Sequence, residues 1–79
     1  MNELKLKIAT QDYVIYQYFP EGEGKPGEIK ITIGNDDASV ISHAEEDNSA
    51  GRYAYRAIKA VKDCVERKVF PMEFIQAWV

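Results

Sequence analysis

The chain has 79 residues, of which 46% are hydrophobic and 29% are charged, and its formal net charge is −3. This length suffices for one hydrophobic core and is too short for two ordinary domains. The composition excludes a disordered chain, because enough apolar surface is available to be buried on folding. We therefore predict a single domain over residues 1–79.

A single cysteine, Cys64, and the residues after Met1 bear on the cellular compartment. One cysteine cannot form an intrachain disulfide, whereas small secreted domains usually depend on several. Asn2 and Glu3 begin an alternating segment rather than a signal peptide, and no apolar run approaches the ~20 residues of a membrane span. We expect a cytoplasmic protein that makes no contact with a membrane.

The first half of the sequence carries the patterns of β-strands. Residues 4–8 and 29–33 alternate apolar and polar side chains, which is typical of strands with one buried face. Residues 13–19 (YVIYQYF) are almost all β-branched or aromatic, which predicts a central strand with both faces at least partly covered. Residues 38–44 form a weaker fourth strand. Because the connections are short, we predict an antiparallel meander within residues 1–44.

After a linker at residues 45–48, the hydrophobic period becomes that of an amphipathic helix. Asp47, Asn48 or Ser49 can cap its start. We predict a helix over residues 49–69 that packs on one face of the sheet. The residues of its apolar stripe are Ala54, Ala57, Ile58, Val61, Val65 and, at the end, Val69.

The C-terminal segment, residues 70–79, fits two structures. Pro71 and Glu73 are typical of the start of a short helix, whereas the apolar residues that follow fit an added strand, and we slightly favour extended structure packed on the sheet. The fold class that we predict is α+β. It consists of a four-stranded antiparallel meander and one amphipathic helix on one sheet face, with the C-terminal segment extended or a short helix.

One cluster offers metal-ligating side chains, and it joins His43 to Glu45, Glu46 and Asp47. A structural metal site needs three or four convergent ligands, and acids before a helix are also explained by its dipole. His43 and Cys64 do not form a recognisable base–nucleophile motif. We predict no enzyme, catalytic residue, metal or cofactor, and keep a small metal-dependent or small-molecule-processing enzyme centred on His43 as an alternative.

Charge is unevenly distributed along the chain. Residues 1–48 carry four lysines and ten acids, whereas residues 49–79 carry six bases and three acids. A basic helix beside a tyrosine-rich sheet would suit nucleic acid, but the acidic first half and the net negative charge oppose it. We expect no nucleic-acid binding. The alternative is a nucleic-acid-associated regulator that uses Arg52, Arg56, Lys59 and Lys62.

One helix covers only one face of the sheet, so the side chains on one face of the central strand need another cover. A second subunit on a twofold axis would cover such a face on both chains at once. We therefore predict a non-catalytic protein-interaction or structural module that acts as a homodimer. The candidate interface residues are Tyr13, Tyr16, Tyr18, Phe74 and Trp78.

The segments YQYFPEGEGKPG and YAYRAIKAVKD carry a resemblance. With the strand between them, the sequence resembles small uncharacterised bacterial proteins that share a Tyr-rich strand, a Pro-Glu-Gly loop ending in Pro-Gly, and a helix with an aromatic first turn. The resemblance covers most of the chain. It implies no substrate, cofactor or catalytic residue.

Overall fold

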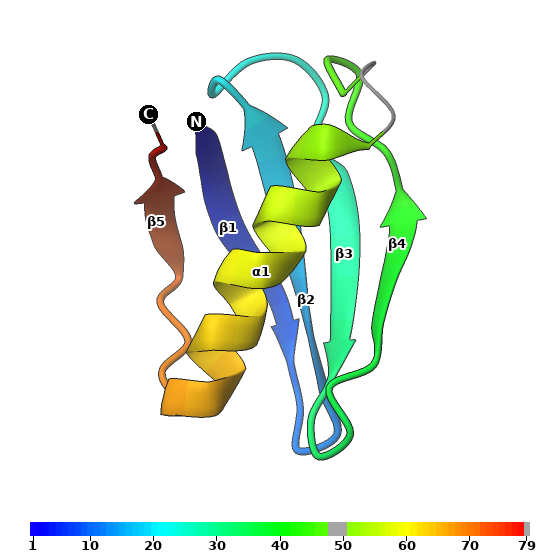
Figure 1. Ribbon diagram of the computed structural model, residues 1–79, viewed down its shortest axis with the longest axis vertical. Coiled ribbons are helices and arrows are strands. Elements are labelled where there is room, and N and C mark those ends of the chain that lie inside the picture. The colour runs from blue at the N-terminus through cyan, green and yellow to red at the C-terminus, as the bar shows by residue number, and fades with distance from the viewer. Residues whose placement is uncertain (48–50, 79) are drawn as a thin grey trace.

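The computed structural model describes residues 1–47 and 51–78, and within them it contains five strands and one helix. The elements are β1 (Asn2–Ala9), β2 (Tyr13–Pro20), β3 (Gly27–Thr32), β4 (Ala38–Ser42), α1 (Arg52–Arg67) and β5 (Glu73–Gln76). The strands form one antiparallel sheet in the order β4-β3-β2-β1-β5 (Figure 1). The predicted α+β class is confirmed, and the C-terminal segment is a fifth strand rather than a helix.

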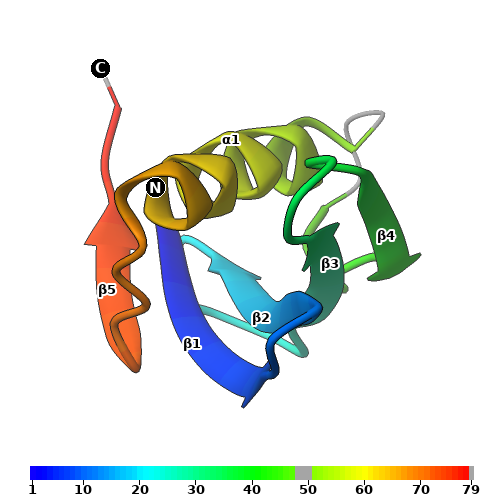
Figure 2. The same ribbon diagram turned by 90° about the horizontal axis from the view of Figure 1, so that it is seen from below.

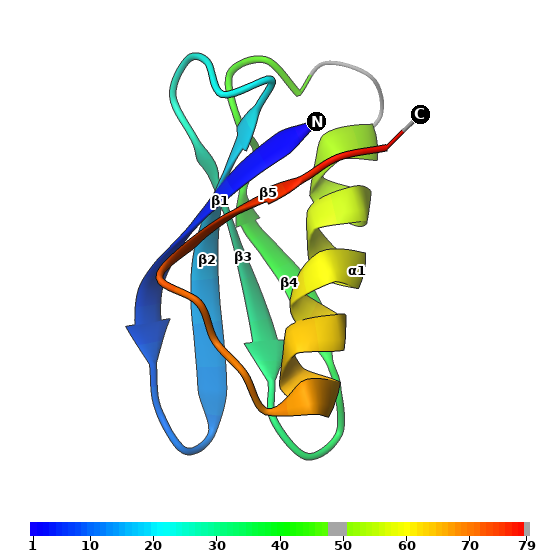
Figure 3. The same ribbon diagram turned by 90° about the vertical axis from the view of Figure 1, so that its left-hand side faces the viewer.

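The sheet curls around α1, so that the helix lies across its concave face (Figures 2 and 3). Helix α1 packs mainly on β3 and β2 and less on β1. Four residues of the predicted stripe, Ala54, Ala57, Val61 and Val65, are buried, and Ile58 is half-buried. The predicted helical face is therefore confirmed. The sheet side of the core consists of Leu4, Val14, Tyr16, Tyr18, Ile29 and Ile31.

The end of α1 differs from the prediction by two residues. Lys68 adopts a left-handed backbone conformation with φ 58°, and the amides of Lys68 and Val69 donate hydrogen bonds to the carbonyls of Val65 and Cys64. These bonds close the last turn at Arg67. As a result Val69 is 52% exposed and does not extend the buried stripe. At the other end, residues 49 and 50 of the predicted helix lie outside the described residues.

Candidate functional site

The acidic cluster around His43 is organised by the buried side chain of Asp47. Its Oδ2 accepts hydrogen bonds from the Tyr18 hydroxyl at 2.7 Å and the Ala54 amide at 3.2 Å, and its Oδ1 accepts one from the Tyr53 amide at 3.2 Å. His43 Nδ1 lies 3.5 Å from Oδ2, with the ring largely exposed. Asp47 therefore satisfies the first amides of α1 and joins the helix to β2.

The hydrogen bonds of this cluster stabilise the carboxylate of Asp47 in the folded chain. Burial alone would raise the pKa of Asp47, but hydrogen bonds from Tyr18, the two helix amides and His43 hold that pKa below its usual value. In residues 1–47 and 51–78, no three His, Cys, Asp or Glu side chains gather closely enough to hold a metal ion. Cys64 is buried in the core, and burial raises the pKa of its thiol, which disfavours the reactive thiolate. That the chain is not an enzyme stays a prediction.

The five candidate interface residues do not share a surface. Tyr16 and Tyr18 are fully buried beneath α1, and the Tyr16 hydroxyl donates a hydrogen bond to a backbone carbonyl at 2.7 Å. Phe74 packs on Tyr16 edge-to-face at 5.7 Å, on the same side of the sheet. Tyr13 lies on the convex face, and Trp78 packs against α1. Because the helix covers the even-numbered side of β2, Tyr16 and Tyr18 are not available to a partner in this fold.

The convex face of the sheet is partly covered by its own lysines. Tyr13, Ile15 and Phe19 are half-buried there. Lys30 Nζ lies 4.5 Å from the centroid of the Tyr13 ring, and Lys5 Nζ lies 5.1 Å from that of Phe19. The aliphatic stems of these lysines shield apolar surface while their charges stay in water. Less apolar surface on the convex face is therefore left for a second subunit to cover than the sequence indicated.

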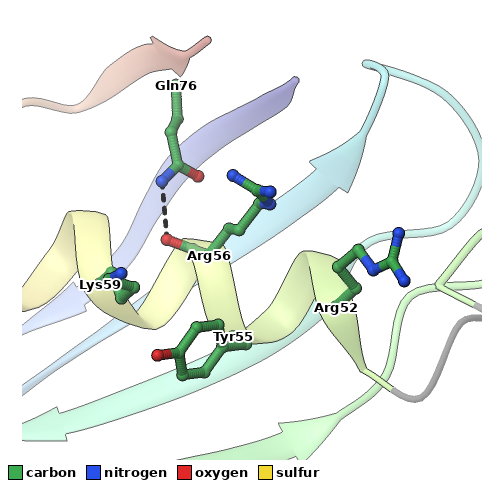
Figure 4. Close-up of a pocket in the computed structure, with 5 residues that line it drawn as sticks. All are labelled: Arg52, Tyr55, Arg56, Lys59 and Gln76. Atoms are coloured by element: carbon green, nitrogen blue, oxygen red, sulfur yellow. Dashed lines mark hydrogen bonds between the residues drawn. The ribbon is translucent and has the colours of Figure 1, made fainter. Parts of the chain in front are cut away.

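A hollow of about 420 Å³ opens on the exposed side of α1, in its N-terminal half (Figure 4). Four of the residues that line this hollow come from α1, where positions three and four apart lie on one face of the helix. The fifth, Gln76, comes from β5 and completes the wall. We call this site the basic hollow, and it is lined by Arg52, Tyr55, Arg56, Lys59 and Gln76.

Hydrogen bonds fix the β5 wall of the basic hollow. Gln76 Nε2 donates to the carbonyl oxygen of Arg56 at 2.7 Å (Figure 4). Gln76 Oε1 accepts a hydrogen bond from Asn2 Nδ2 at 3.1 Å, and the same Asn2 nitrogen donates to the carbonyl of Tyr53 at 3.0 Å. Asn2 is fully buried, so this chain of contacts ties β1, β5 and α1 together. Gln76 is thus held in place by the fold.

Aromatic rings hold two of the cations of the basic hollow. The Arg56 guanidinium lies 4.5 Å from the centroid of the Trp78 ring, and Lys59 Nζ lies 5.3 Å from that of Tyr55. Stacking of this kind restricts a long side chain and leaves its charge available. Tyr55 itself is 63% exposed. The hollow therefore presents an aromatic surface beside fixed positive charge.

No acid in the described part of the chain forms an ion pair with the cations of the basic hollow. Among the ion pairs of residues 1–47 and 51–78, none involves Arg52, Arg56 or Lys59. The first turn of α1 contains Arg52 and no acid, although a helix dipole favours negative charge at that end. A cation at the N-terminal end of a helix departs from this preference for acids, and such departures are expected at functional sites. This arrangement suits a negatively charged ligand.

The sequence indicated part of this site. Arg52, Arg56 and Lys59 belong to the basic face predicted for the helix, whereas Lys62, the fourth member, does not line the hollow. Tyr55 was missed, although its spacing of three and four residues from two of these cations is a usable signal. Gln76 was also missed. Its place depends on the pairing of β5 with β1, which no local pattern indicates.

No helix in the described part of the chain is long and apolar enough to cross a membrane. The resemblance to small bacterial proteins stays a prediction. No protein-family model, no curated protein and no solved structure matches the chain.

Proposed function

We propose that the protein is a non-catalytic protein-interaction module that binds an acidic segment of a partner protein in the basic hollow. The observation that carries the proposal is the composition of the site: three cations without a carboxylate partner among the described residues, beside the exposed Tyr55 and the Arg56–Trp78 stack. Arg, Tyr and Trp are the residues most enriched at the energetic centres of protein interfaces. A protein partner is therefore the ligand that this composition fits best.

The spacing of the cations favours an extended segment. Arg52 and Arg56 are one helical turn apart, which is about 6 Å along the axis. Alternate side chains of an extended peptide point the same way and are roughly 6.6 Å apart. Two acids separated by one residue would therefore face the two guanidinium groups, and each guanidinium can bind a carboxylate through two hydrogen bonds. The exposed Tyr55 ring lies beside Lys59 on the same helix and offers apolar contact to a neighbouring residue of the segment.

The alternative ligand, nucleic acid, would use the same cations. A long polyanion also meets the charges of the acidic first half, which carries four lysines and ten acids. A short acidic segment responds mainly to charges within about 8–10 Å, because more distant ones are screened at physiological salt. The charge distribution thus favours a short acidic segment over nucleic acid.

Fluorescence anisotropy with a labelled peptide of alternating Glu and Gly tests the proposal. We expect a dissociation constant on the order of 100 µM at low salt. Arg56→Gln and Tyr55→Ala should each weaken binding about fivefold or more, a loss of roughly 1 kcal/mol. Lys62→Gln removes one exposed charge of α1 outside the hollow and is the matched control, which should change the constant by less than about twofold.

Two results would contradict the proposal. Equal losses from Lys62→Gln and Arg56→Gln would mean that the peptide responds to the overall charge of the helix and not to the hollow. Tighter binding of a labelled oligothymidine of matched charge, with a steep salt dependence, would favour the nucleic-acid alternative. A peptide of alternating Lys and Gly serves as the negative probe.

A further inference from the structure

Two amide side chains at the β5 wall of the basic hollow are fixed in one orientation. Asn2 and Gln76 lie directly opposite each other in the β1–β5 ladder, so their side chains leave the same face of the sheet, towards α1. Asn2 Nδ2 donates a hydrogen bond to the Tyr53 carbonyl at 3.0 Å, and Gln76 Nε2 donates one to the Arg56 carbonyl at 2.7 Å (Figure 4). Because a carbonyl oxygen can only accept, each amide must turn its nitrogen towards the helix.

This orientation leaves one buried oxygen unpaired. Asn2 is fully buried, and its Oδ1 makes no hydrogen bond within residues 1–47 and 51–78. A buried polar atom of this kind destabilises the folded chain, and native proteins contain few of them. The same side chain donates to Gln76 Oε1 at 3.1 Å and so engages the oxygen of that amide. Asn2 thus holds Gln76 while its own oxygen stays unpaired, as expected of a residue that positions a functional group.

The fixed Gln76 amide makes the polar lining of the hollow almost entirely one of donors. Its oxygen is engaged by Asn2, and its nitrogen carries a second hydrogen that no hydrogen bond within the described residues uses. Guanidinium and ammonium groups donate and cannot accept. Among the five lining side chains, only the Tyr55 hydroxyl keeps an oxygen that is able to accept. The hollow therefore fits a ligand that is rich in acceptor oxygens.

A phosphorylated side chain matches these donors better than a carboxylate does. A carboxylate has two oxygens and one negative charge, whereas a phosphate monoester has three acceptor oxygens and a charge of about −1.5 to −2 at pH 7. The guanidinium of Arg56 can bind two of these oxygens, and the Gln76 amide contacts the backbone of the same residue at the β5 wall. Arg52 and Lys59 are exposed one helical turn before and after Arg56, which places a further cation on each side of it.

We infer that the basic hollow selects a phosphorylated residue within the acidic segment of the partner protein, and that Asn2 positions the Gln76 donor for it. This inference rests on the proposed function and names the anion that the hollow binds best. A nucleic acid offers phosphodiesters with one negative charge each, so it brings less charge to the three cations at any one point. The exposed Tyr55 ring and the Arg56–Trp78 stack fit a polypeptide around the phosphoryl group. These observations favour a protein as its source.

Three labelled peptides test this selectivity by fluorescence anisotropy on the full chain. The first is the peptide of alternating Glu and Gly, the second has phosphoserine in place of its central Glu, and the third matches the net charge of the second through an added Glu. We expect the second peptide to bind about tenfold more tightly than the first and about fivefold more tightly than the third. Equal affinities of the second and third would overturn the inference, while binding of the first would still support the proposed function. Failure of all three to bind would overturn both.

The ratio of the dissociation constants for the second and third peptides tests the role of the two amides. Gln76→Ala removes the donor and Asn2→Ala releases the amide oxygen, so each should reduce the preference for phosphoserine at least about threefold. Gln11→Ala changes an exposed glutamine between β1 and β2 and is the matched control. A general loss of stability lowers the folded fraction equally for both peptides, so the ratio responds only to the site. An unchanged ratio in Gln76→Ala would overturn the role of the amide, whether or not Asn2→Ala folds.

Two further probes identify the source of the phosphoryl group. Inorganic phosphate should displace the phosphoserine peptide only at concentrations at least about tenfold above the dissociation constant of that peptide, because it makes no contact with Tyr55. Displacement at equal concentration would mean that a free anion is the ligand, and would overturn the partner segment. Tighter binding of a 5′-phosphorylated oligothymidine than of the phosphoserine peptide would assign the site to nucleic acid instead.

Discussion

Replacing Tyr18 with Phe removes a single oxygen atom from a fully buried site that joins β2 to α1. The Tyr18 hydroxyl donates a hydrogen bond to Asp47 Oδ2 at 2.7 Å and accepts one from the Ala44 amide at 3.0 Å. Phe fills the same ring volume, so the substitution leaves the packing intact. The change in stability therefore reports these two hydrogen bonds.

The structure sets the size of the expected loss. A hydrogen bond to a charged group contributes about 1.5–3 kcal/mol, and a buried amide without a partner costs about 1–3 kcal/mol. The two terms are coupled through one hydroxyl, and Asp47 keeps its bonds from the Tyr53 and Ala54 amides, so the terms do not add fully. We expect Tyr18→Phe to lower the free energy of unfolding by about 2–4 kcal/mol. That is a large part of the stability of a small domain.

Urea denaturation followed by circular dichroism measures this loss. Tyr13→Phe is the matched control, because Tyr13 is half-buried on the convex face of the same strand and its hydroxyl makes no hydrogen bond within the described residues. The control should change stability by less than about 0.5 kcal/mol. Equal effects of the two substitutions would refute the reasoning, since Asp47 would then not depend on Tyr18.

Three further predictions concern the same core. The pKa of Asp47 is lowered in the folded chain, so the carboxylate contributes to the free energy of unfolding above the unfolded pKa of about 3.9, and this contribution is lost as the pH falls towards the folded pKa. Between neutral and acidic pH, the urea midpoint of the wild type should therefore fall more steeply than that of Tyr18→Phe. Equal slopes for the two proteins would contradict this prediction. Gly27→Ala should destabilise by about 1–3 kcal/mol in urea, because the new Cβ would overlap the Tyr18 ring. Val61→Ala should lower the free energy of unfolding by about 1–3 kcal/mol, because Val61 is fully buried. Lys62→Ala, which changes the exposed residue next to it, should leave the urea midpoint nearly unchanged.

The elements that follow from local pattern were predictable from the sequence. The alternation in residues 4–8 and 29–33 and the apolar run at 13–19 correspond to β1, β3 and β2. The helical period correctly placed Val61 and Val65 on the buried face. These predictions succeed because side-chain spacing of two or 3.6 residues determines which face of an element is buried.

The remaining features depend on contacts between distant parts of the chain. β5 is four residues long, and it is a strand because it pairs with β1 in a register that sets Lys5 opposite Glu73. The sequence identified Asp47 as a possible cap, but it did not indicate Tyr18, which is 29 residues away, as its partner. The positive charges of the basic hollow were readable on the helix. The hollow itself was not predictable, because its wall depends on Gln76, which the pairing of β5 with β1 places beside α1.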